Sequence, residues 1–356
     1  MGQGSDDAKK LRVFFIAGLI ILLMAILLNV CFGTENIPIH SILLIILSKI
    51  PGMGSLWNHE ADIGNWDMII INLRLPVVVM AMLVGSALAT SGAALQGLFR
   101  NPLVDPFLIG ISAGGAFGTV LGSILTSGLD YQTAIAITMI LSFVCSLISI
   151  AVAYPISKTG NTVSISTLLL AGIALSAFLT ALTQILMYFY IYDLKSMVFS
   201  LMGSLGNTRW ADVGIVTPFV LLCGGLLMFF GRDLNAFSAG EDGAKHLGVD
   251  VEKSKFLILG ASALITAVTV PFCGVIGFVG LIIPHIVRFF IGPDHRTLLP
   301  ASAMIGATFL LLCDLISRNA MYLLFDSYAE IPVGIVTALV GGLFFIYLLA
   351  TRRRAG

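Results

Sequence analysis

The stretch Ser238–Lys255, SAGEDGAKHLGVDVEKSK, is the longest polar segment between two strongly apolar halves of the chain. Charged and histidine side chains alternate there with a few apolar ones, and three glycines interrupt it. Because glycine permits a turn and is a poor residue inside a helix, the stretch predicts two very short helices hinged at Gly248. A short charged hinge between membrane halves suits docking to a soluble partner. An ordinary solvated loop explains the same residues equally well.

The composition on both sides of this stretch sets the class of protein. Of the 356 residues, 58% are hydrophobic and 11% are charged, and the mean hydropathy is +1.02. Soluble domains carry about 25% charged residues, so a soluble chain of this composition could not cover its surface. The class is therefore an all-α polytopic membrane protein. The net charge is zero, which gives no bulk argument for nucleic-acid binding.

Apolar runs along the chain predict about ten transmembrane helices. They lie at about residues 13–32, 70–95, 107–127, 133–156, 165–190 and 213–231, twice within 256–291, and at about 298–316 and 332–350. The run 256–291 is too long for one helix, and Pro271 and Gly274 near its middle predict a break. The segment at about 39–50 is apolar but too short to cross, which predicts an interfacial or re-entrant helix.

The positions of lysine and arginine orient these spans. With ten spans, both termini fall on one side, and 14 of the 19 basic residues then lie on that side and 5 on the other. Loops rich in Lys and Arg stay in the cytoplasm. The pattern therefore predicts a multi-pass protein of the cell membrane, with cytoplasmic termini and a cytoplasmic hinge.

Several chemical motifs do not occur in the sequence. There is no Gly-Lys dipeptide, which excludes a P-loop and an ATPase of that type. There is no His-x-x-x-His or Cys-x-x-Cys, and the five cysteines are scattered through apolar runs, so no metal site, catalytic residue or cofactor is predicted. Apart from Asp314, the spans carry almost no charge, which argues against an ion-coupled carrier. The energy for any transport must then come from another protein.

Two arginines stand at the predicted outer face. Arg74 precedes Pro76, and Arg318 follows the ninth span, four residues after Asp314. The simpler interpretation is interfacial snorkelling for Arg74 and an i,i+4 ion pair for Arg318. The alternative is a pair of basic contacts for an acidic external partner. On the inner face, the two prolines of the segment Arg100–Pro106 favour a rigid turn over a direct functional contact.

Several blocks together resemble the FecCD-type permeases of ABC importers for iron-siderophores, haem and cobalamin. They run in order over nearly the whole chain: Arg74–Pro76, Leu83–Gly118, Leu168–Ser176, Met202–Gly206, Gly274–Arg288, Asp294–Pro300 and Glu330–Leu349. The resemblance implies one transmembrane permease domain over residues 1–356, with the type II ABC importer fold. It also implies a second permease subunit, expected to form a homodimer, two cytoplasmic ABC ATPase subunits and an extracytoplasmic substrate-binding protein.

The resemblance also assigns roles to residues. In the hinge at 238–255, which would couple the permease to the ATPase, the matching positions are Glu241, Ala244, Leu247 and Gly248. Arg74 and Arg318 match arginines that meet the binding protein, although Val77 stands where a further arginine is often found. Candidates for the wall of the passage are Ser176, Thr180, Thr183 and Gln184. The segment Met202–Gly206 matches a short helix near the outer mouth.

The function expected is therefore import by alternating access, driven by separate ATPase subunits, with no enzyme activity of the chain itself. Two alternatives stay open. A zinc or manganese ABC permease would be expected to show His or Asp ligands along the passage, and a secondary carrier working alone would be expected to bury several charges. Which chelate is carried does not follow from these residues.

Overall fold

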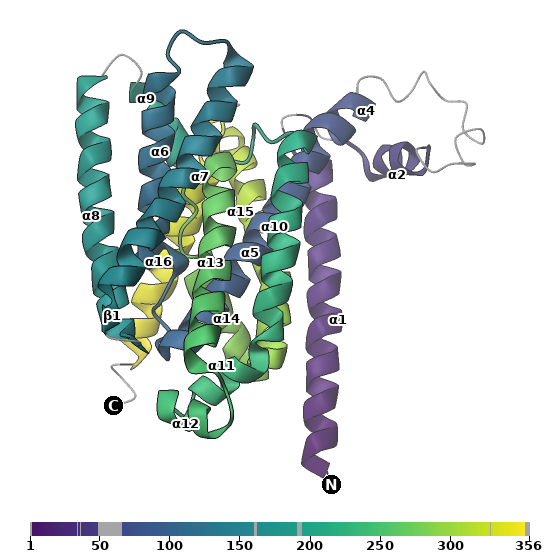
Figure 1. Ribbon diagram of the computed structural model, residues 1–356. Helices are drawn as coiled ribbons and strands as arrows, with labels where there is room; N and C mark the ends of the chain where they lie inside the picture. Colours follow the sequence, from purple (N-terminus) through teal and green to yellow (C-terminus); the bar gives the residue numbers. More distant parts are fainter. Residues whose placement is uncertain are drawn as a thin grey trace.

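The computed structural model describes residues 2–33, 35, 37–48, 66–159, 162–190, 194–327 and 329–352. Within these residues the chain forms a bundle of long helices with one two-stranded hairpin (Figure 1). The expectation of an all-α membrane protein is confirmed.

In the described part of the chain, ten apolar helices build the bundle, and they correspond in order to the ten predicted spans. Seven are long and apolar enough to cross a membrane: α1 (Gly2–Cys31), α5 (Leu75–Phe99), α7 (Tyr131–Ile156), α8 (Ile165–Phe189), α10 (Trp210–Phe229), α13 (Val251–Cys273) and α15 (His295–Phe325). Three have shorter apolar stretches: α6 (Ile111–Leu125), α14 (Val279–Ile291) and α16 (Val333–Arg352).

Short elements connect these helices. At one end of the bundle are α2 (Ile39–Ser48), α4 (Trp66–Met68), a π-helix η2 (Ile69–Arg74) and α9 (Leu194–Leu201). At the other end are a 3-10 helix η3 (Pro106–Ile109), the antiparallel strands β1 (Lys158–Thr159) and β2 (Thr162–Val163), and two short helices, α11 (Gly231–Phe237) and α12 (Glu241–His246). The expected interfacial helix is thus a helix of ten residues, α2, which lies beside the bundle in Figure 1.

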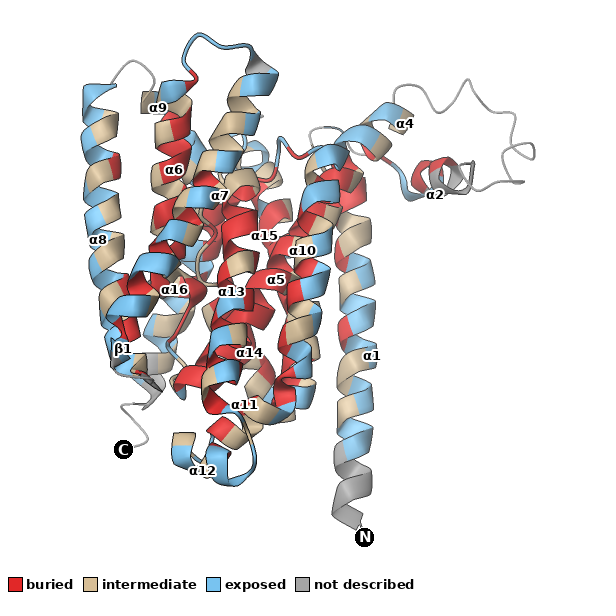
Figure 2. Ribbon diagram, viewed as in Figure 1, coloured by how far each residue is buried: buried red, intermediate tan, exposed pale blue. Residues whose placement is uncertain are grey.

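The core of the bundle is formed by α5, α13 and α15, which are the most deeply buried helices in Figure 2. Small residues allow α5 to approach its neighbours closely. A Cβ added at Gly85 would meet the carbonyl of Gly306 on α15, and one added at Gly92 would meet the carbonyl of Gly280 on α14. Backbone contacts of this kind are how membrane helices associate without a hydrophobic driving force between them.

The two ends of the bundle differ as the sequence predicts. The N-terminal end of α1, the C-terminal end of α16 and the polar segment with α12 all lie at one end, and α4 and α9 lie at the other (Figure 1). An even number of spans requires this arrangement. We refer below to the end that carries α12, which the sequence predicts to be cytoplasmic, as the inner end, and to the opposite end as the outer end.

The long apolar run 256–291 is broken where the glycines predict. Helix α13 ends at Cys273, and α14 begins at Val279. Gly274 has φ +65°, and Phe278 lies in the left-handed region at φ +70°. Pro271 does not cause the break, because it is accommodated inside α13.

Two local predictions are wrong. Gly248 does not hinge two short helices, because the chain turns there from α12 directly into the long helix α13. The short helix that pairs with α12 is α11, which precedes it. The segment Met202–Gly206 is not helical, since α9 ends at Leu201. There, Ser204 N–H donates to the carbonyl of Cys273 (2.9 Å), so the segment covers the end of α13 instead.

Candidate functional site

The inner end carries the α12 corner, which we define as residues 240–250. Gly248 has φ +86°, a conformation that favours glycine, and ends the helix. Its N–H donates to the carbonyl of Lys245 (2.9 Å), and the N–H of Val249 donates to that of Ala244 (3.0 Å). This pair of bonds is a Schellman motif, which satisfies carbonyls that the short helix would otherwise leave unpaired. The corner is therefore a defined structure rather than a loose loop.

A buried lysine holds this corner against the bundle. The ammonium of Lys255, whose side chain is 1% exposed, contacts Glu241 Oε2 at 2.7 Å and Glu252 Oε1 at 3.1 Å. It also donates to the carbonyl of Val163 in β2 (3.2 Å). One side chain thus connects α12, α13 and the hairpin that joins α7 to α8. A charge buried this deeply requires such partners.

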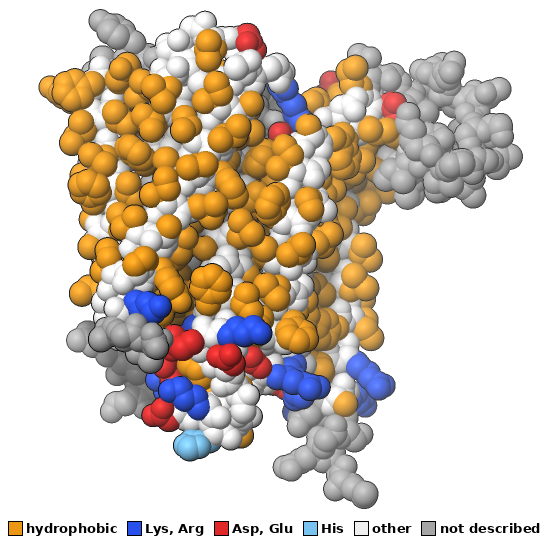
Figure 3. Space-filling view, in the orientation of Figure 1, with side chains coloured by type: hydrophobic (Ala, Val, Ile, Leu, Met, Phe, Trp, Pro, Cys, Tyr) orange, Lys and Arg blue, Asp and Glu red, His pale blue; other side chains and the backbone are white. Residues whose placement is uncertain are grey.

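The four residues expected to couple to an ATPase therefore have different surroundings. Leu247 is 69% exposed, and Gly248 beside it is also exposed, so both can meet a partner. Ala244 is fully buried and packs inward, and Glu241 is engaged by Lys255. The inner end around this corner carries charged side chains of both signs, below a broad band of hydrophobic ones (Figure 3). No role was predicted for Lys255 from the sequence, although its i,i+3 spacing from Glu252 is a weak indication of an ion pair.

A groove of about 820 Å³ runs beside the α12 corner. It lies between the junction of α10 with α11 on one side and the corner with the start of α13 on the other. Phe230 and Leu257 contribute apolar surface, while Asp233 and Lys253 contribute charges. Such a mixed surface can receive a protein partner at the same place where Leu247 projects.

The four passage candidates lie on α8, which stands at the edge of the single chain (Figure 1). Their spacing places them along one side of the helix. Thr180 and Gln184 are exposed, whereas Thr183 is buried and its hydroxyl donates to the carbonyl of Leu179 (2.8 Å). The buried hydroxyl oxygen of Ser176 has no hydrogen-bond partner among the described residues. Large apolar side chains such as Phe178 are also exposed on α8.

Arg74, expected at the outer surface, is only 6% exposed. Its guanidinium donates to the carbonyls of Val30 (2.5 Å) and Cys31 (3.2 Å) at the end of α1, and to that of Glu35. These are carbonyls that a helix end leaves without intrahelical partners. In this structure the side chain of Arg74 therefore joins α1 to the start of α5, and its charge is not presented to an external carboxylate.

Arg318 is also turned inward. It pairs with Asp314 at 2.7 Å, which confirms the expected i,i+4 ion pair, and it donates to Asn29 Oδ1 at 2.6 Å. The amide of Asn29 in turn donates to the carbonyls of Ala25 (2.9 Å) and Leu311 (3.0 Å). We call Asn29, Arg74, Asp314 and Arg318 the outer polar cluster, which links α1, α5 and α15.

The segment Arg100–Pro106 is the rigid turn that its prolines favour. Asn101 Oδ1 accepts from the N–H of Leu103 (3.0 Å), and Asp105 Oδ1 accepts from that of Phe107 (2.9 Å). The other carboxylate oxygen of Asp105 is buried and has no partner among the described residues. Burial raises the pKa of Asp105 to about 6, although its hydrogen bond to Phe107 acts in the opposite direction.

Metal ligands do not gather in the part of the chain that the structure describes. No group of three or more His, Cys, Asp or Glu residues there is arranged to hold a metal ion. The five cysteines are free thiols; four of them are buried and Cys145 is half-buried.

The chain is similar to known transport proteins over most of its length. A sequence profile described as the FecCD transport family matches residues 21–351. The chain is 41% identical over 286 residues to a cobalamin import system permease protein of Halobacterium salinarum, which covers 80% of this chain and 74% of that protein. It is 38% identical over 324 residues to a hemin transport system permease protein of Yersinia pestis, covering 87% and 95% of the two chains.

A solved structure also matches this fold. It is a metal-chelate type ABC transporter in an inward-facing conformation, and it superposes with a TM-score of 0.80 at 31% identity. The match covers 96% of this chain and 99% of that one. The likeness therefore extends to the complete bundle and is not confined to a few helices.

Proposed function

The chain belongs to the FecCD transport family and is a permease of an ABC importer, and from this premise we propose that it carries a metal chelate by alternating access. The cargo we propose is a chelate of the iron-siderophore, haem or cobalamin type. Relatives named for cobalamin and hemin transport support this class. A passage lined by neutral polar side chains, such as Thr180 and Gln184, suits a large ligand that must leave as readily as it enters.

The observation that carries the proposal is the α12 corner, which is exposed at its tip and braced at its base. We propose that two cytoplasmic ATPase subunits bind this corner and the groove beside it, one on each permease subunit. Leu247 and Gly248 would form the contact surface, while Ala244 and the ion pair from Glu241 to Lys255 would transmit displacement into α13. A rigid link is needed, because a bistable bundle moves only if the force reaches its core helices.

The exposed face of α8 supports a second permease subunit. Of the most apolar 18-residue stretch of α8, only 11% is buried within one chain. This helix nevertheless carries polar side chains to which lipid would offer no hydrogen-bond partner. We propose a homodimer in which the α8 helices of the two subunits face the passage. Ser176, Thr180, Thr183 and Gln184 are then candidates for its wall.

Docking of a substrate-binding protein at the outer end is part of the same proposal. For Arg74 and Arg318 to meet its carboxylates, both side chains would have to leave the internal bonds of the outer polar cluster. That release costs free energy, because each carbonyl or carboxylate that now accepts from an arginine would be left without its donor. The docking role of these two arginines therefore requires a rearrangement at the outer end.

The test is reconstitution in liposomes of the purified chain with and without its ATPase subunit. We expect no ATP hydrolysis and no uphill uptake from the chain alone, because the sequence has no P-loop. Adding the ATPase and a chelate-loaded binding protein should produce both. ATP turnover by the chain alone, or uphill uptake without the ATPase, would contradict the proposal.

A further inference from the structure

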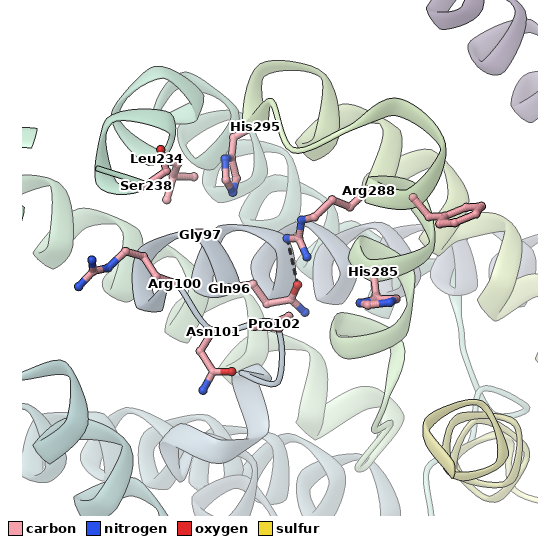
Figure 4. A pocket seen from close by; sticks show the side chains of 11 residues that line it. Gln96, Gly97, Arg100, Asn101, Pro102, Leu234, Ser238, His285, Arg288 and His295 are labelled. Carbon is pink, nitrogen blue, oxygen red and sulfur yellow. Dashed lines mark hydrogen bonds between the residues drawn. The ribbon is translucent and has the colours of Figure 1, made fainter. Parts of the chain in front are cut away.

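A second cavity at the inner end is not explained by the proposed function. Its volume is about 500 Å³, and it lies between the end of α5, the turn that follows it, α11, α14 and the start of α15 (Figure 4). Side chains with hydrogen-bond donors line it, among them Gln96, Arg100, Asn101, Ser238 and Arg288. No aspartate or glutamate is among the described residues that line it.

The two arginines of this pocket lack a carboxylate counter-ion among the residues that the structure describes. One guanidinium nitrogen of Arg288 donates to Gln96 Oε1 (3.2 Å), and the amide of Gln96 is oriented by the carbonyl of Gly280 (3.1 Å). Across the described residues, no carboxylate lies within ion-pair distance of Arg288 or Arg100. The remaining donors of both side chains therefore suit an oxyanion, which arginine binds through several hydrogen bonds at once.

A third group at the wall of the pocket also lacks a partner among the described residues, but it is an acceptor rather than a donor. His295 is 7% exposed, and its Nδ1 lies 2.9 Å from Asn235 Oδ1. The amide nitrogen of Asn235 donates to Asp294 (2.7 Å), which fixes its oxygen toward the histidine and so places the proton on Nδ1. The buried Nε2 is then unprotonated, so it can accept a hydrogen bond but not donate one. It has no partner among the described residues and is directed toward Gly97, inside the pocket.

The position of the pocket indicates where an anion would come from. Phe289, which follows Arg288 and also lines the pocket, is 84% exposed, and Phe290 is 63% exposed. These apolar side chains lie at the end of α14, and Figure 3 shows, on the face that it presents, a broad hydrophobic surface that gives way to charged side chains at the inner end. The pocket is thus at the level where phospholipid headgroups meet acyl chains, and basic pockets between helices on the cytoplasmic side suit such headgroups.

We propose that this pocket binds the phosphate headgroup of an anionic phospholipid, with Arg288 as its ligand inside the pocket and the acyl chains passing over Phe289. Arg100, whose guanidinium points away from Arg288 in Figure 4, would turn toward the headgroup from the rim of the pocket. The guanidinium of Arg100 also lies beside the start of α12, since a Cβ added at Gly240 would be 3.5 Å from its Nη1. A bound lipid would therefore stand next to the α12 corner. The inference does not depend on which cargo the permease carries.

The test is a lipid titration of the full chain in a neutral detergent, followed by native mass spectrometry. The probes are dioleoylphosphatidylglycerol and, as a neutral phospholipid, dioleoylphosphatidylcholine. We expect tighter binding of the anionic lipid, and about tenfold weaker binding of it to Arg288→Gln and to Arg100→Gln. Arg232→Gln is the matched control, because it removes the same charge from an exposed inner-end residue outside this pocket and should leave the affinity unchanged.

Three results would overturn the inference. The first is equal affinity for the two lipids, and the second is an equal loss in Arg232→Gln. The third is displacement of the lipid by millimolar inorganic phosphate, which would assign the pocket to a soluble anion instead. Because Arg100 is exposed and its substitution leaves the half-buried Arg288 in place, Arg100→Gln keeps the test decisive if Arg288→Gln does not fold. Melting temperatures in lipid-free detergent check the folding of each variant.

Discussion

Lys255 combines a positive charge with nearly complete burial, and this makes it the residue on which the inner end most depends. Its two carboxylate partners are about one-third exposed, at 31% for Glu241 and 34% for Glu252, so each can be hydrated if the lysine is lost. The carbonyl of Val163 would lose its donor at the same time. Removing the ammonium should therefore loosen the contacts among α12, α13 and β2 without leaving a fully buried charge.

We expect Lys255→Met to lower the stability of the purified chain by about 1–2 kcal/mol, between the values for surface and buried ion pairs. It should also reduce uptake driven by the ATPase more than it reduces binding of the ATPase. Melting temperature, binding affinity and uptake would be measured in parallel. Lys195→Met is the control, since Lys195 is exposed on α9 at the opposite end of the bundle, outside the groove. An equal effect of both substitutions would show that Lys255 does not hold the α12 corner against the bundle.

Asp105 gives a prediction about pH. Burial raises its pKa to about 6 from the ordinary 3.8, so the folded chain binds this proton more tightly than the unfolded chain does. The cost of the buried charge is present above pH 6 and disappears as the pH falls toward 3.8, with an upper bound of about 3 kcal/mol. Asp105→Asn, which can still accept from Phe107, should therefore raise the melting temperature at pH 7.5. The difference from the parent chain should narrow at pH 5, and a constant difference would contradict the burial of a charged Asp105.

At the scale of secondary-structure elements, the α12 corner depends on a backbone conformation rather than on a side chain. Gly248 ends α12 at φ +86°, and a Cβ there would meet nothing within 4 Å. An alanine would thus be strained by its own backbone and not by a clash. The cost of a left-handed residue other than glycine is about 1 kcal/mol, which is enough to shift the end of a six-residue helix.

We expect Gly248→Ala to leave the chain inserted and folded but to uncouple ATP hydrolysis from uptake. Glu241→Gln, which weakens the ion pair to Lys255, should act in the same direction. The measurement is the ratio of chelate imported to ATP hydrolysed in liposomes. Gly214→Ala is a control, because that glycine also has open space around it and lies on α10, away from the corner. An unchanged ratio in both corner variants would show that coupling does not pass through α12.

Elements were predicted well where composition decides them and poorly where local backbone geometry does. The break between α13 and α14 follows from glycines that the sequence displays, and it was predicted. The inward direction of Arg74 was not, because it is the last residue of a π-helix, whose i→i+5 bonds shift side chains away from the faces expected of an α-helix. The two short helices of the inner end were predicted on either side of Gly248, whereas α11 and α12 lie on either side of Gly240. The two glycines are equally plausible turns in the sequence alone.

At the scale of the whole molecule, α8 is the candidate membrane span that a single chain buries least, at 11% of its most apolar 18-residue stretch among the described spans. The number of spans and the common end of both termini follow from hydropathy and charge, which sum over many residues and so tolerate local errors. Contacts between subunits leave no comparable signal in one sequence. Thr180 and Gln184 read as neutral polar residues in a membrane helix, whether they face lipid, another helix or a passage.

The proposed dimer makes a cross-linking prediction. Thr180→Cys on α8 should give a covalent dimer with a short bifunctional maleimide in membranes, because the α8 helices of two subunits would face each other. Leu221→Cys on α10, which is 67% exposed, should not. The parent chain is the background control, since its five cysteines are buried or half-buried. A dimer formed through residue 221 and not through residue 180 would place the interface on a different face.

The outer polar cluster has a mechanical consequence for the transport cycle. Asn29, Arg74 and Arg318 tie the last turn of α1 to α5 and α15 through bonds to backbone carbonyls and to one another. The rest of α1 is mainly exposed, since only 22% of its most apolar 18-residue stretch is buried. This helix is thus fixed by polar bonds at one tip, while nearer its other end Gly18 and Phe14 pack against Met304 and Phe290 through apolar contacts, so tilting of the core about that tip would displace these contacts first.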